Sequence, residues 1–152
     1  MKKEKYIFID VSSEPPDLKR AFDFVKHDEA GAVNMFTGTT RNHHDGKTVV
    51  ELYYDCYREM AVSELRKIAD KMVDKYNLKR IYLVHRTGLV PVGEASVILA
   101  VSAAHRKEVF AATAEAMDLI KQDVPIWKRE SYGNETVWKE ELFIKSDIKK
   151  KK

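Results

Sequence analysis

The chain has 152 residues, a length that fits one domain built around a single core. Its 44% hydrophobic and 34% charged residues exclude a disordered chain, and no apolar run approaches the length of a membrane-spanning helix. Four positive charges belong to the lysines at 149–152, so the remainder of the +3 chain is close to neutral. Cys56 is the only cysteine, which excludes an internal disulfide and predicts a cytoplasmic location.

The periodicity of apolar residues predicts the secondary structure in chain order. Strands are predicted over 5–11, 32–38, 48–57, 80–86, 96–102, 126–131 and 136–142, with helices from the start signals at 12–16 to 27, over 58–76 and over 103–122. An Asp-Gly turn at 45–46 predicts a hairpin of the second and third strands, and Gly-Asn at 133–134 predicts another at the end. The result is one α+β domain over 1–144 with a mixed or antiparallel sheet, hairpins and two long amphipathic helices, followed by a flexible basic tail at 145–152.

Helical spacing also predicts which side chains of each helix face the core. The predicted buried residues are Leu18, Phe22 and Val25 in the first helix, Ala61, Leu65, Ile68, Ala69, Met72, Val73 and Tyr76 in the second, and Val109, Phe110, Ala114, Met117 and Ile120 in the third. The segment between Gly88 and Gly93, which contains Pro91, is predicted to be a connector.

Two lysines flank a stiff aromatic connector in the segment Lys-Gln-Asp-Val-Pro-Ile-Trp-Lys-Arg-Glu at 121–130. Pro125 fixes its own φ and extends the residue before it, so Lys121 ends the third helix and Lys128 lies on the next strand with little slack between them. A lysine can act as a nucleophile, a proton carrier or an anion clamp. A cation at a helix C-terminus and an exposed alternating strand also account for the two lysines.

Three other groups of polar residues are candidates for a functional site. Arg41 follows Phe-Thr-Gly-Thr-Thr at a strand end, where the backbone N–H groups of 38 and 39 could help it hold an anion; a surface arginine is the alternative. His105 and Arg106 open the third helix, against the preference of the macrodipole, and either an anion between them or exposure to water explains this. His43 and His44 are interpreted as a solvated loop, and no metal site is expected.

An ordered set of motifs resembles the large, catalytic subunit of molybdopterin synthase, the MoaE family. The matching residues are Gly31-Ala32, Phe36-Thr37-Gly38 with Arg41, Leu52 to Asp55, Met60-Ala61, His85 to Gly88, Val92 to Glu94, Ser102 with His105-Arg106, Lys121, Pro125 to Glu130, Trp138 and Glu140. The resemblance implies an α/β-hammerhead-like fold and an enzyme that converts cyclic pyranopterin monophosphate into molybdopterin. It further implies a sulfur donor, the C-terminal thiocarboxylate of a small ubiquitin-like subunit, and a heterotetramer with two large subunits at its centre, without a cofactor.

The same resemblance implies roles for particular residues. Lys121 and Lys128 match the catalytic pair. The substrate-binding positions are matched by Thr39, Thr40, Arg41, His105, Arg106, Lys121, Lys128, Arg129 and Glu130. Two anionic reactants need positive charge near them, and neighbouring cations favour the free-amine form of a lysine. We therefore expect Lys121 to engage the donor's terminal carbonyl and Lys128 to assist opening of the cyclic phosphate.

The spacing of two predicted groups points to a shared site. His105 and Lys121 are sixteen residues apart on one predicted helix, about 24 Å at 1.5 Å per residue. A small pterin cannot easily touch both ends, so we expect the active site to be shared across a homodimer interface.

Two other function classes compete with an enzyme. A nucleic-acid-binding α+β module would use the lysine tail and aromatic side chains such as Tyr53 and Tyr57, although the near-neutral body argues against it. A binding scaffold without catalysis is the third possibility, and the presence of both Lys121 and Lys128 argues against that one.

Overall fold

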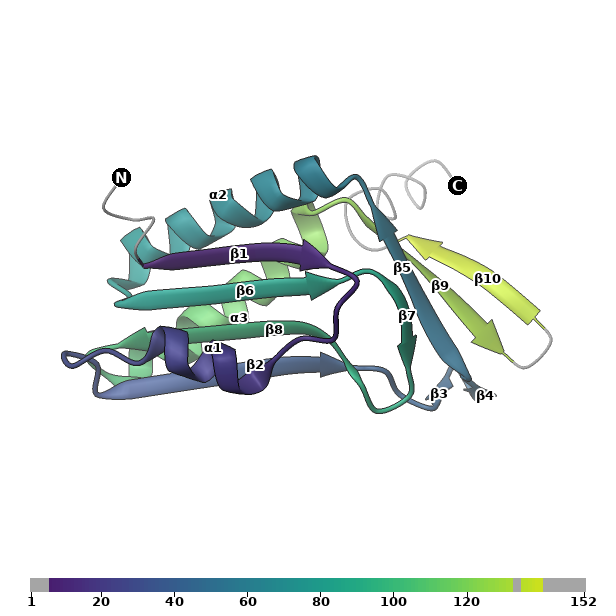
Figure 1. The fold of residues 1–152 in the computed structure, drawn as a ribbon, viewed down its shortest axis with the longest axis horizontal. Helices are drawn as coiled ribbons and strands as arrows, with labels where there is room; N and C mark the ends of the chain where they lie inside the picture. The colour runs from purple at the N-terminus through teal and green to yellow at the C-terminus, as the bar shows by residue number, and fades with distance from the viewer. Residues whose placement is uncertain (1–5, 133–134, 141–152) are drawn as a thin grey trace.

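The computed structural model describes residues 6–132 and 135–140, which form two four-stranded sheets, a small hairpin and three helices (Figure 1). The strands are β1 (Ile7–Ser12), β2 (Ala32–Thr39), β3 (His43–His44), β4 (Lys47–Thr48), β5 (Glu51–Cys56), β6 (Arg80–Arg86), β7 (Gly88–Pro91), β8 (Ala95–Ala103), β9 (Ile126–Tyr132) and β10 (Glu135–Glu140). The helices are α1 (Leu18–Val25), α2 (Arg58–Tyr76) and α3 (Arg106–Asp123). The predicted α+β class is confirmed. The boundary at 144 and the tail at 145–152 lie outside the described residues.

The first sheet has the strand order β1-β6-β8-β2, with β1 parallel to β6 and the other neighbours antiparallel. Helices α2 and α3 cover one face and α1 covers the other (Figure 1). Leu83 and Leu99 belong to the core under α2 and α3, whereas Tyr82 and Ile98 pack against α1. Burial on both faces explains why β6 and β8 have nearly continuous apolar sequences.

The second sheet has the order β10-β9-β5-β7 and is antiparallel throughout. Only Thr87 separates β6 of the first sheet from β7 of the second, so the chain passes directly from one sheet to the other. The predicted final hairpin is confirmed by the pairing of β9 with β10, in which Tyr132 lies opposite Glu135.

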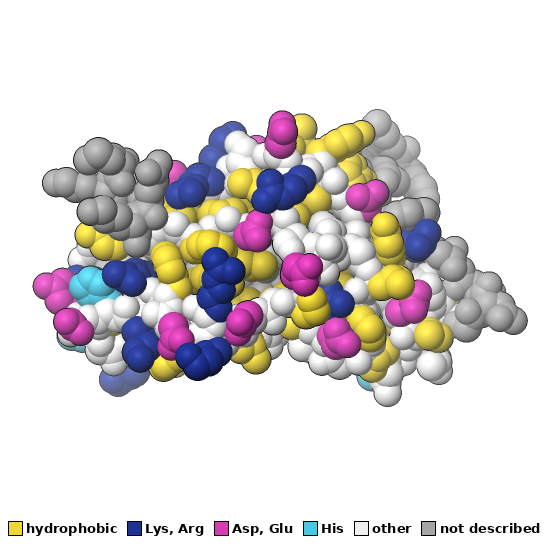
Figure 2. Space-filling view, in the orientation of Figure 1, with side chains coloured by type: hydrophobic (Ala, Val, Ile, Leu, Met, Phe, Trp, Pro, Cys, Tyr) yellow, Lys and Arg dark blue, Asp and Glu magenta, His cyan; other side chains and the backbone are white. Residues whose placement is uncertain are grey.

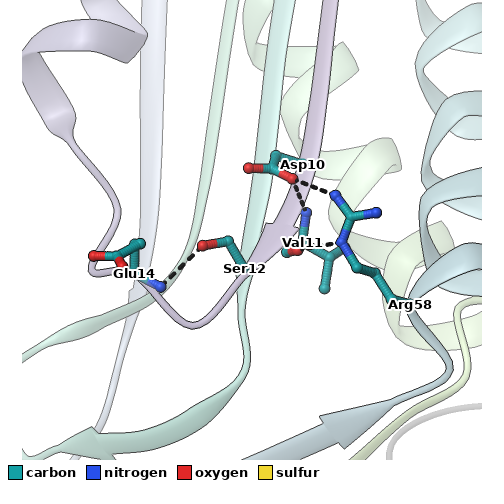
Figure 3. Close-up of polar contacts among 5 residues, drawn as sticks. All are labelled: Asp10, Val11, Ser12, Glu14 and Arg58. Atoms are coloured by element: carbon teal, nitrogen blue, oxygen red, sulfur yellow. Dashed lines mark hydrogen bonds and ion pairs between the residues drawn. The ribbon is translucent and has the colours of Figure 1, made fainter.

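A network of hydrogen bonds joins the end of β1 to the start of α2 (Figure 3). The Arg58 guanidinium donates to the Val11 carbonyl oxygen at 2.9 Å and to the Asp10 carboxylate at 2.8 Å. The same Asp10 oxygen accepts from the Val11 N–H, and the Ser12 hydroxyl oxygen accepts from the Glu14 N–H as the chain turns away. These contacts fix the N-terminal end of α2 over the edge of the first sheet.

The prediction for the second helix is confirmed in its bounds and in most of its buried face, and the predicted Val73 and Tyr76 are half-buried. α2 buries Ala61, Leu65, Ile68, Ala69 and Met72 and ends at Asn77, whose left-handed φ of 53° closes the last turn. Lys75 and Tyr76 of α2 both donate to the Glu115 carboxylate of α3 and so tie the two helices together. None of the helices among the described residues is both long and apolar enough to span a membrane.

The predicted hairpin of the second and third strands is wrong. β2 pairs with β8 in the first sheet, whereas β5 pairs with β7 and β9 in the second. The Asp45-Gly46 turn does form, with φ of 52° and 77°, but it joins only the two-residue strands β3 and β4. Turn chemistry predicted the local reversal correctly, but the longer strands found partners far away in sequence. The connector expected between Gly88 and Gly93 likewise contains a paired strand, β7.

Two predicted helix faces are partly wrong. In α1 the buried side chains are Ala21 and Val25, and Leu18 and Phe22 are exposed. In α3 the buried stripe includes Val109 and Ile120 as predicted, but Phe110 is 60% exposed. The buried positions otherwise fall at Ala112, Thr113 and Ala116, with Ala114 exposed. Alanines and a threonine thus occupy buried positions beside Val25, Val109 and Ile120, whereas Leu18, Phe22 and Phe110 lie outside.

Candidate functional site

A cavity of about 230 Å³ lies where the two sheets meet the C-terminal end of α3. Strands β2, β6 and β8 of the first sheet line one side, and β5 and β9 of the second sheet line the other. Five residues predicted to form the site line it: Thr39, Arg41, Lys121, Lys128 and Glu130. Its other polar lining residues are His43, His44, Tyr54, His85 and Ser96, and the apolar lining includes Phe36, Leu52, Met117 and Ile126.

The two predicted catalytic lysines come from consecutive elements that meet at the cavity. Lys121 lies in the last turn of α3, where a cation also suits the helix dipole. Lys128 is the third residue of β9, which begins only three residues after α3 ends. The connector contains Val124 and Pro125, both buried, and so holds the end of the helix close to the start of the strand. The expected short separation of the two elements is therefore present.

Strand alternation decides which residues of β9 face the cavity. Lys128 and Glu130 line the cavity, and Glu130 is only 2% exposed. Arg129, between them, points to the opposite face, where its guanidinium lies 4.6 Å from the centre of the Tyr53 ring. Successive side chains of a strand point to opposite faces. The predicted neighbours Arg129 and Glu130 are therefore separated, and only Glu130 lines the cavity in this protomer.

Alternation and a bulge likewise separate the residues predicted at the end of β2. Thr39 and Arg41 line the cavity, whereas Thr40 is buried and its hydroxyl donates to the Val90 carbonyl oxygen at 3.3 Å. The pairing register of β2 with β8 shifts between Gly38 and Thr39. Bulges of this kind reorient side chains at strand ends. The Arg41 guanidinium lies 3.5 Å from Nδ1 of His44.

The helix N-terminus predicted to bind an anion is remote from the cavity. His105 is the N-cap of α3 and Arg106 its first residue, and both are exposed. Lys121 lies in the last turn of the same helix. His105 and Arg106 are not among the residues lining the cavity. Within one protomer, the structure does not bring these two predicted residues together with Lys121.

His85 belongs to a matching motif but was assigned no role from the sequence; it lines the cavity from β6 and is 7% exposed. Its Nδ1 lies 2.8 Å from the Arg86 carbonyl oxygen, so this nitrogen carries the proton and Nε2 lies on the other side of the ring. The ring also meets Tyr54 edge-on at 5.1 Å. His85 therefore contacts β5 of the second sheet, at the residue that lies opposite Lys128 of β9.

The two loop histidines also lie closer to the site than expected. His43 and His44 form β3 and line the cavity, so the interpretation as a merely solvated loop is incomplete. His44 is half-buried, with Nε2 3.1 Å from the Asp45 carboxylate. The Asp-Gly turn at 45–46 was the sequence signal for this placement. It pairs β3 with β4 directly after β2, whose residue Thr39 lines the same cavity.

The charges of the cavity favour an anionic ligand. Three side chains that carry positive charge, Arg41, Lys121 and Lys128, line it together with one carboxylate, Glu130. Guanidinium and ammonium groups in a partly enclosed site bind phosphate and carboxylate oxygens strongly. The fold and the site together define an α+β protein with a cationic pocket at the junction of its two sheets.

Comparison with known proteins identifies the family. The sequence profile described as "MoaE protein" matches residues 11–123. The chain is 43% identical over 143 residues to a molybdopterin synthase catalytic subunit of Dictyostelium discoideum, across 91% of this chain and 90% of that protein. A molybdopterin synthase crystal structure from Staphylococcus aureus superposes with a TM-score of 0.82 and 31% identity, covering 89% of this chain and 96% of that one. The chain therefore belongs to the MoaE family, and the resemblance seen in its motifs is confirmed.

A third comparison concerns the fold alone. A Helicobacter pylori structure, described as a complex of subunits 1 and 2 of molybdopterin-converting factor, superposes with a TM-score of 0.70. The alignment covers 87% of this chain and 88% of that one at 21% identity. None of these relatives favours the alternative of a nucleic-acid-binding module. Figure 2 shows basic and acidic side chains interspersed on one face of the molecule, where no broad basic surface is visible.

Proposed function

We propose that this chain is the catalytic subunit of a molybdopterin synthase and acts as a sulfurtransferase. Its substrate is cyclic pyranopterin monophosphate, and its product is the dithiolene of molybdopterin. The observation that carries the proposal is the convergence of Lys121, Lys128 and Arg41 on one cavity in a member of this family. The substrate carries a phosphate and the sulfur donor a thiocarboxylate, so both reactants are anions that these cations attract.

The two lysines take different roles in this proposal. Lys121 engages the terminal carbonyl of the sulfur donor and assists proton transfer as sulfur leaves. Lys128 clamps the cyclic phosphate or protonates its leaving oxygen as the ring opens. The supporting observation is their placement: Lys121 is exposed at the end of α3, open to an incoming chain, whereas Lys128 is half-buried on β9 beside Tyr54.

The sulfur donor in this proposal is a small ubiquitin-like subunit with a C-terminal thiocarboxylate. A narrow chain end of this kind can reach a cavity that a folded domain cannot enter. The Helicobacter pylori protein that shares the fold was solved as a complex of two subunits, which supports a two-subunit assembly for this chain. We further propose that two copies of this chain form the centre of a heterotetramer.

A homodimer formed through β2 would bring the start of α3, with His105 and Arg106, close to the cavity of the other copy. β2 is the last strand of the first sheet, and Val33, Met35 and Phe36 on it are 36% to 38% exposed. An apolar, unpaired strand edge favours pairing with another chain. Ala32 lies opposite Ala103, just before α3, whereas Thr39 lies at the cavity. Antiparallel pairing of two β2 edges would therefore bring His105 and Arg106 of one copy towards the cavity of the other.

Reconstitution tests the proposed function. The chain is combined with its small subunit in thiocarboxylate form and with cyclic pyranopterin monophosphate, and the dithiolene product is measured. We expect product with the wild-type chain and none with Lys121→Ala,Lys128→Ala. Equal product from the double variant, shown to be folded by circular dichroism, would refute the proposal.

A further inference from the structure

Backbone hydrogen bonds join the segment that carries Arg41 to the turn between β7 and β8. The Thr40 N–H donates to the Glu94 carbonyl oxygen at 3.1 Å, and the Gly93 N–H donates to the Thr40 carbonyl oxygen at 2.8 Å. The Thr40 hydroxyl adds a third bond, to the Val90 carbonyl oxygen. Thr40 is 3% exposed, so these bonds lie away from water. The residue before Arg41 is therefore attached to this turn by two hydrogen bonds and to β7 by a third.

The turn itself is fixed by a charged pair behind the cavity. The Arg86 guanidinium contacts the Glu94 carboxylate at 2.8 Å. The Arg86 side chain is only 10% exposed, whereas that of Glu94 is 49% exposed. Arg86 follows His85 on β6, and strand alternation directs it away from the cavity that His85 lines. A rigid central strand thus holds a surface turn by one charge-assisted hydrogen bond.

The end of β2 has little room to adjust on its own. A Cβ added at Gly38 would lie 2.7 Å from Cγ1 of Val97, so this strand packs closely on β8. The Gly38 carbonyl oxygen also accepts from the Ser96 hydroxyl at 3.2 Å. The register shift follows at once, between Gly38 and Thr39. The direction of Arg41 is therefore set by two attachments, the close packing before the bulge and the turn after it.

We propose that Arg86 and Glu94 are positioning residues that direct Arg41 into the cavity. Neither residue lines the cavity, and both act through the backbone of Thr40. Loss of the Glu94 charge frees the turn, and Arg41 then binds the anion less well. This inference rests on the proposed function only in taking the anion to be the substrate phosphate.

Hydrogen exchange tests the structural half of this inference without any turnover. In Glu94→Gln the amides of Thr40 and Gly93 should exchange at least about tenfold faster than in the wild-type chain. The Val49 amide, which donates to the Asn42 carbonyl oxygen on the other side of Arg41, should be unchanged. Asp10→Asn is the matched control, because it removes an ion pair of the same 2.8 Å length at another end of the sheet. Unchanged exchange at Thr40 in Glu94→Gln would overturn the inference.

A double-mutant cycle tests the functional half. Binding of pyrophosphate and of cyclic pyranopterin monophosphate is measured by calorimetry for Arg41→Ala, Glu94→Gln and the double variant. We expect each single change to weaken binding about tenfold, and the double variant to bind no more weakly than Arg41→Ala alone. The proton-transfer step should keep its rate, so KM rises while kcat is retained. Additive losses would contradict positioning through Arg41.

A second variant, Glu94→Asp, and the measurement of dithiolene product separate failure of this inference from failure of the proposed function. Glu94→Asp retains the charge but shortens the side chain, so it should give an intermediate exchange rate and affinity while the protein stays folded. Absence of dithiolene product from the wild-type chain would count against the proposed function alone, since exchange and pyrophosphate binding still report on Arg41. Faster exchange in Glu94→Gln with unchanged anion affinity would overturn the inference.

Discussion

At the scale of single residues, the chemistry of the site depends on whether lysine amines or only fixed positive charges are needed in the cavity. Lys121 and Lys128 both line it, and a cation would be enough if their only role were to attract anions. An amine is required if Lys121 engages an acyl group, because a guanidinium stays protonated and is a poor nucleophile. Replacement of lysine by arginine separates these two roles.

Lys121→Arg should keep substrate affinity within about twofold and lower kcat by roughly 100-fold. The reason is that the positive charge is retained and the amine is lost. Steady-state measurements of product formation with excess sulfur donor give kcat, and calorimetry gives the affinity. Lys67→Arg, an exposed lysine on α2, is the control for the substitution itself. Wild-type turnover in Lys121→Arg would refute an amine role.

His85 shows why some site residues escape sequence analysis. It stands inside the apolar sequence of β6, where a polar residue is most simply explained as a satisfied core group. Its importance appears only when the second sheet brings Tyr54 against its ring. Motif resemblance included His85 but gave roles only to residues such as Lys121, Lys128 and Arg41, which the structure brings to one cavity. Their catalytic and binding roles stay predictions.

At the scale of elements, the structure tests how far periodicity determines a fold. α2 was predicted well because its apolar residues recur at helical spacing along the whole of 58–76, and the structure ends the helix there, at Asn77. The hairpin of β2 with β5 was predicted wrongly because the choice of strand partner depends on contacts between distant residues. The separation of Arg129 from Glu130 follows from strand alternation, which was visible in the sequence once β9 was assigned.

The contact between α2 and α3 predicts a dependence of stability on pH. Hydrogen bonds from Lys75 and then Tyr76 lower the pKa of Glu115 below its usual 4.5. The stabilisation is therefore complete above pH 4.5 and is lost as the pH falls through the lowered value. Glu115→Gln should reduce the melting temperature by about 2 °C at pH 7, since the contact is near the surface.

Calorimetric melting of both proteins from pH 7 down to pH 3 measures this effect. The difference between the wild-type chain and Glu115→Gln should shrink towards the acid end of the range. Asp23→Asn removes the exposed Lys19–Asp23 pair on α1. It is the control for the loss of an ion pair that does not join two helices. A difference that stays constant with pH would show that the Glu115 charge is not responsible.

At the scale of the whole molecule, the predicted site is divided between two ends of one helix. His105 and Arg106 lie at the start of α3, and the cavity lies at its end. Mixed dimers of His105→Ala,Arg106→Ala with Lys121→Ala should recover about half of the wild-type activity per dimer, since one of the two shared sites is then intact. No recovery in verified mixed dimers would contradict a shared site.

The β2 edge gives a second test of the assembly. Met35→Lys places a charge on that edge and should convert the proposed dimer to a monomer in analytical ultracentrifugation. Because each site then lacks its second half, activity should fall while the circular dichroism spectrum is retained. Phe110→Lys places the same charge on the exposed face of α3 and is the control, so it should leave the proposed dimer intact. A Met35→Lys variant that stays dimeric would place the interface elsewhere.

The most direct measurement is a crystal structure of this chain, in its proposed dimer, with cyclic pyranopterin monophosphate bound. We expect the phosphate within hydrogen-bonding distance of Arg41, with the pterin between Lys121 and Lys128 in the cavity where the two sheets meet. Density for the pterin at a surface remote from both lysines, with this cavity empty, would contradict the assignment of the site.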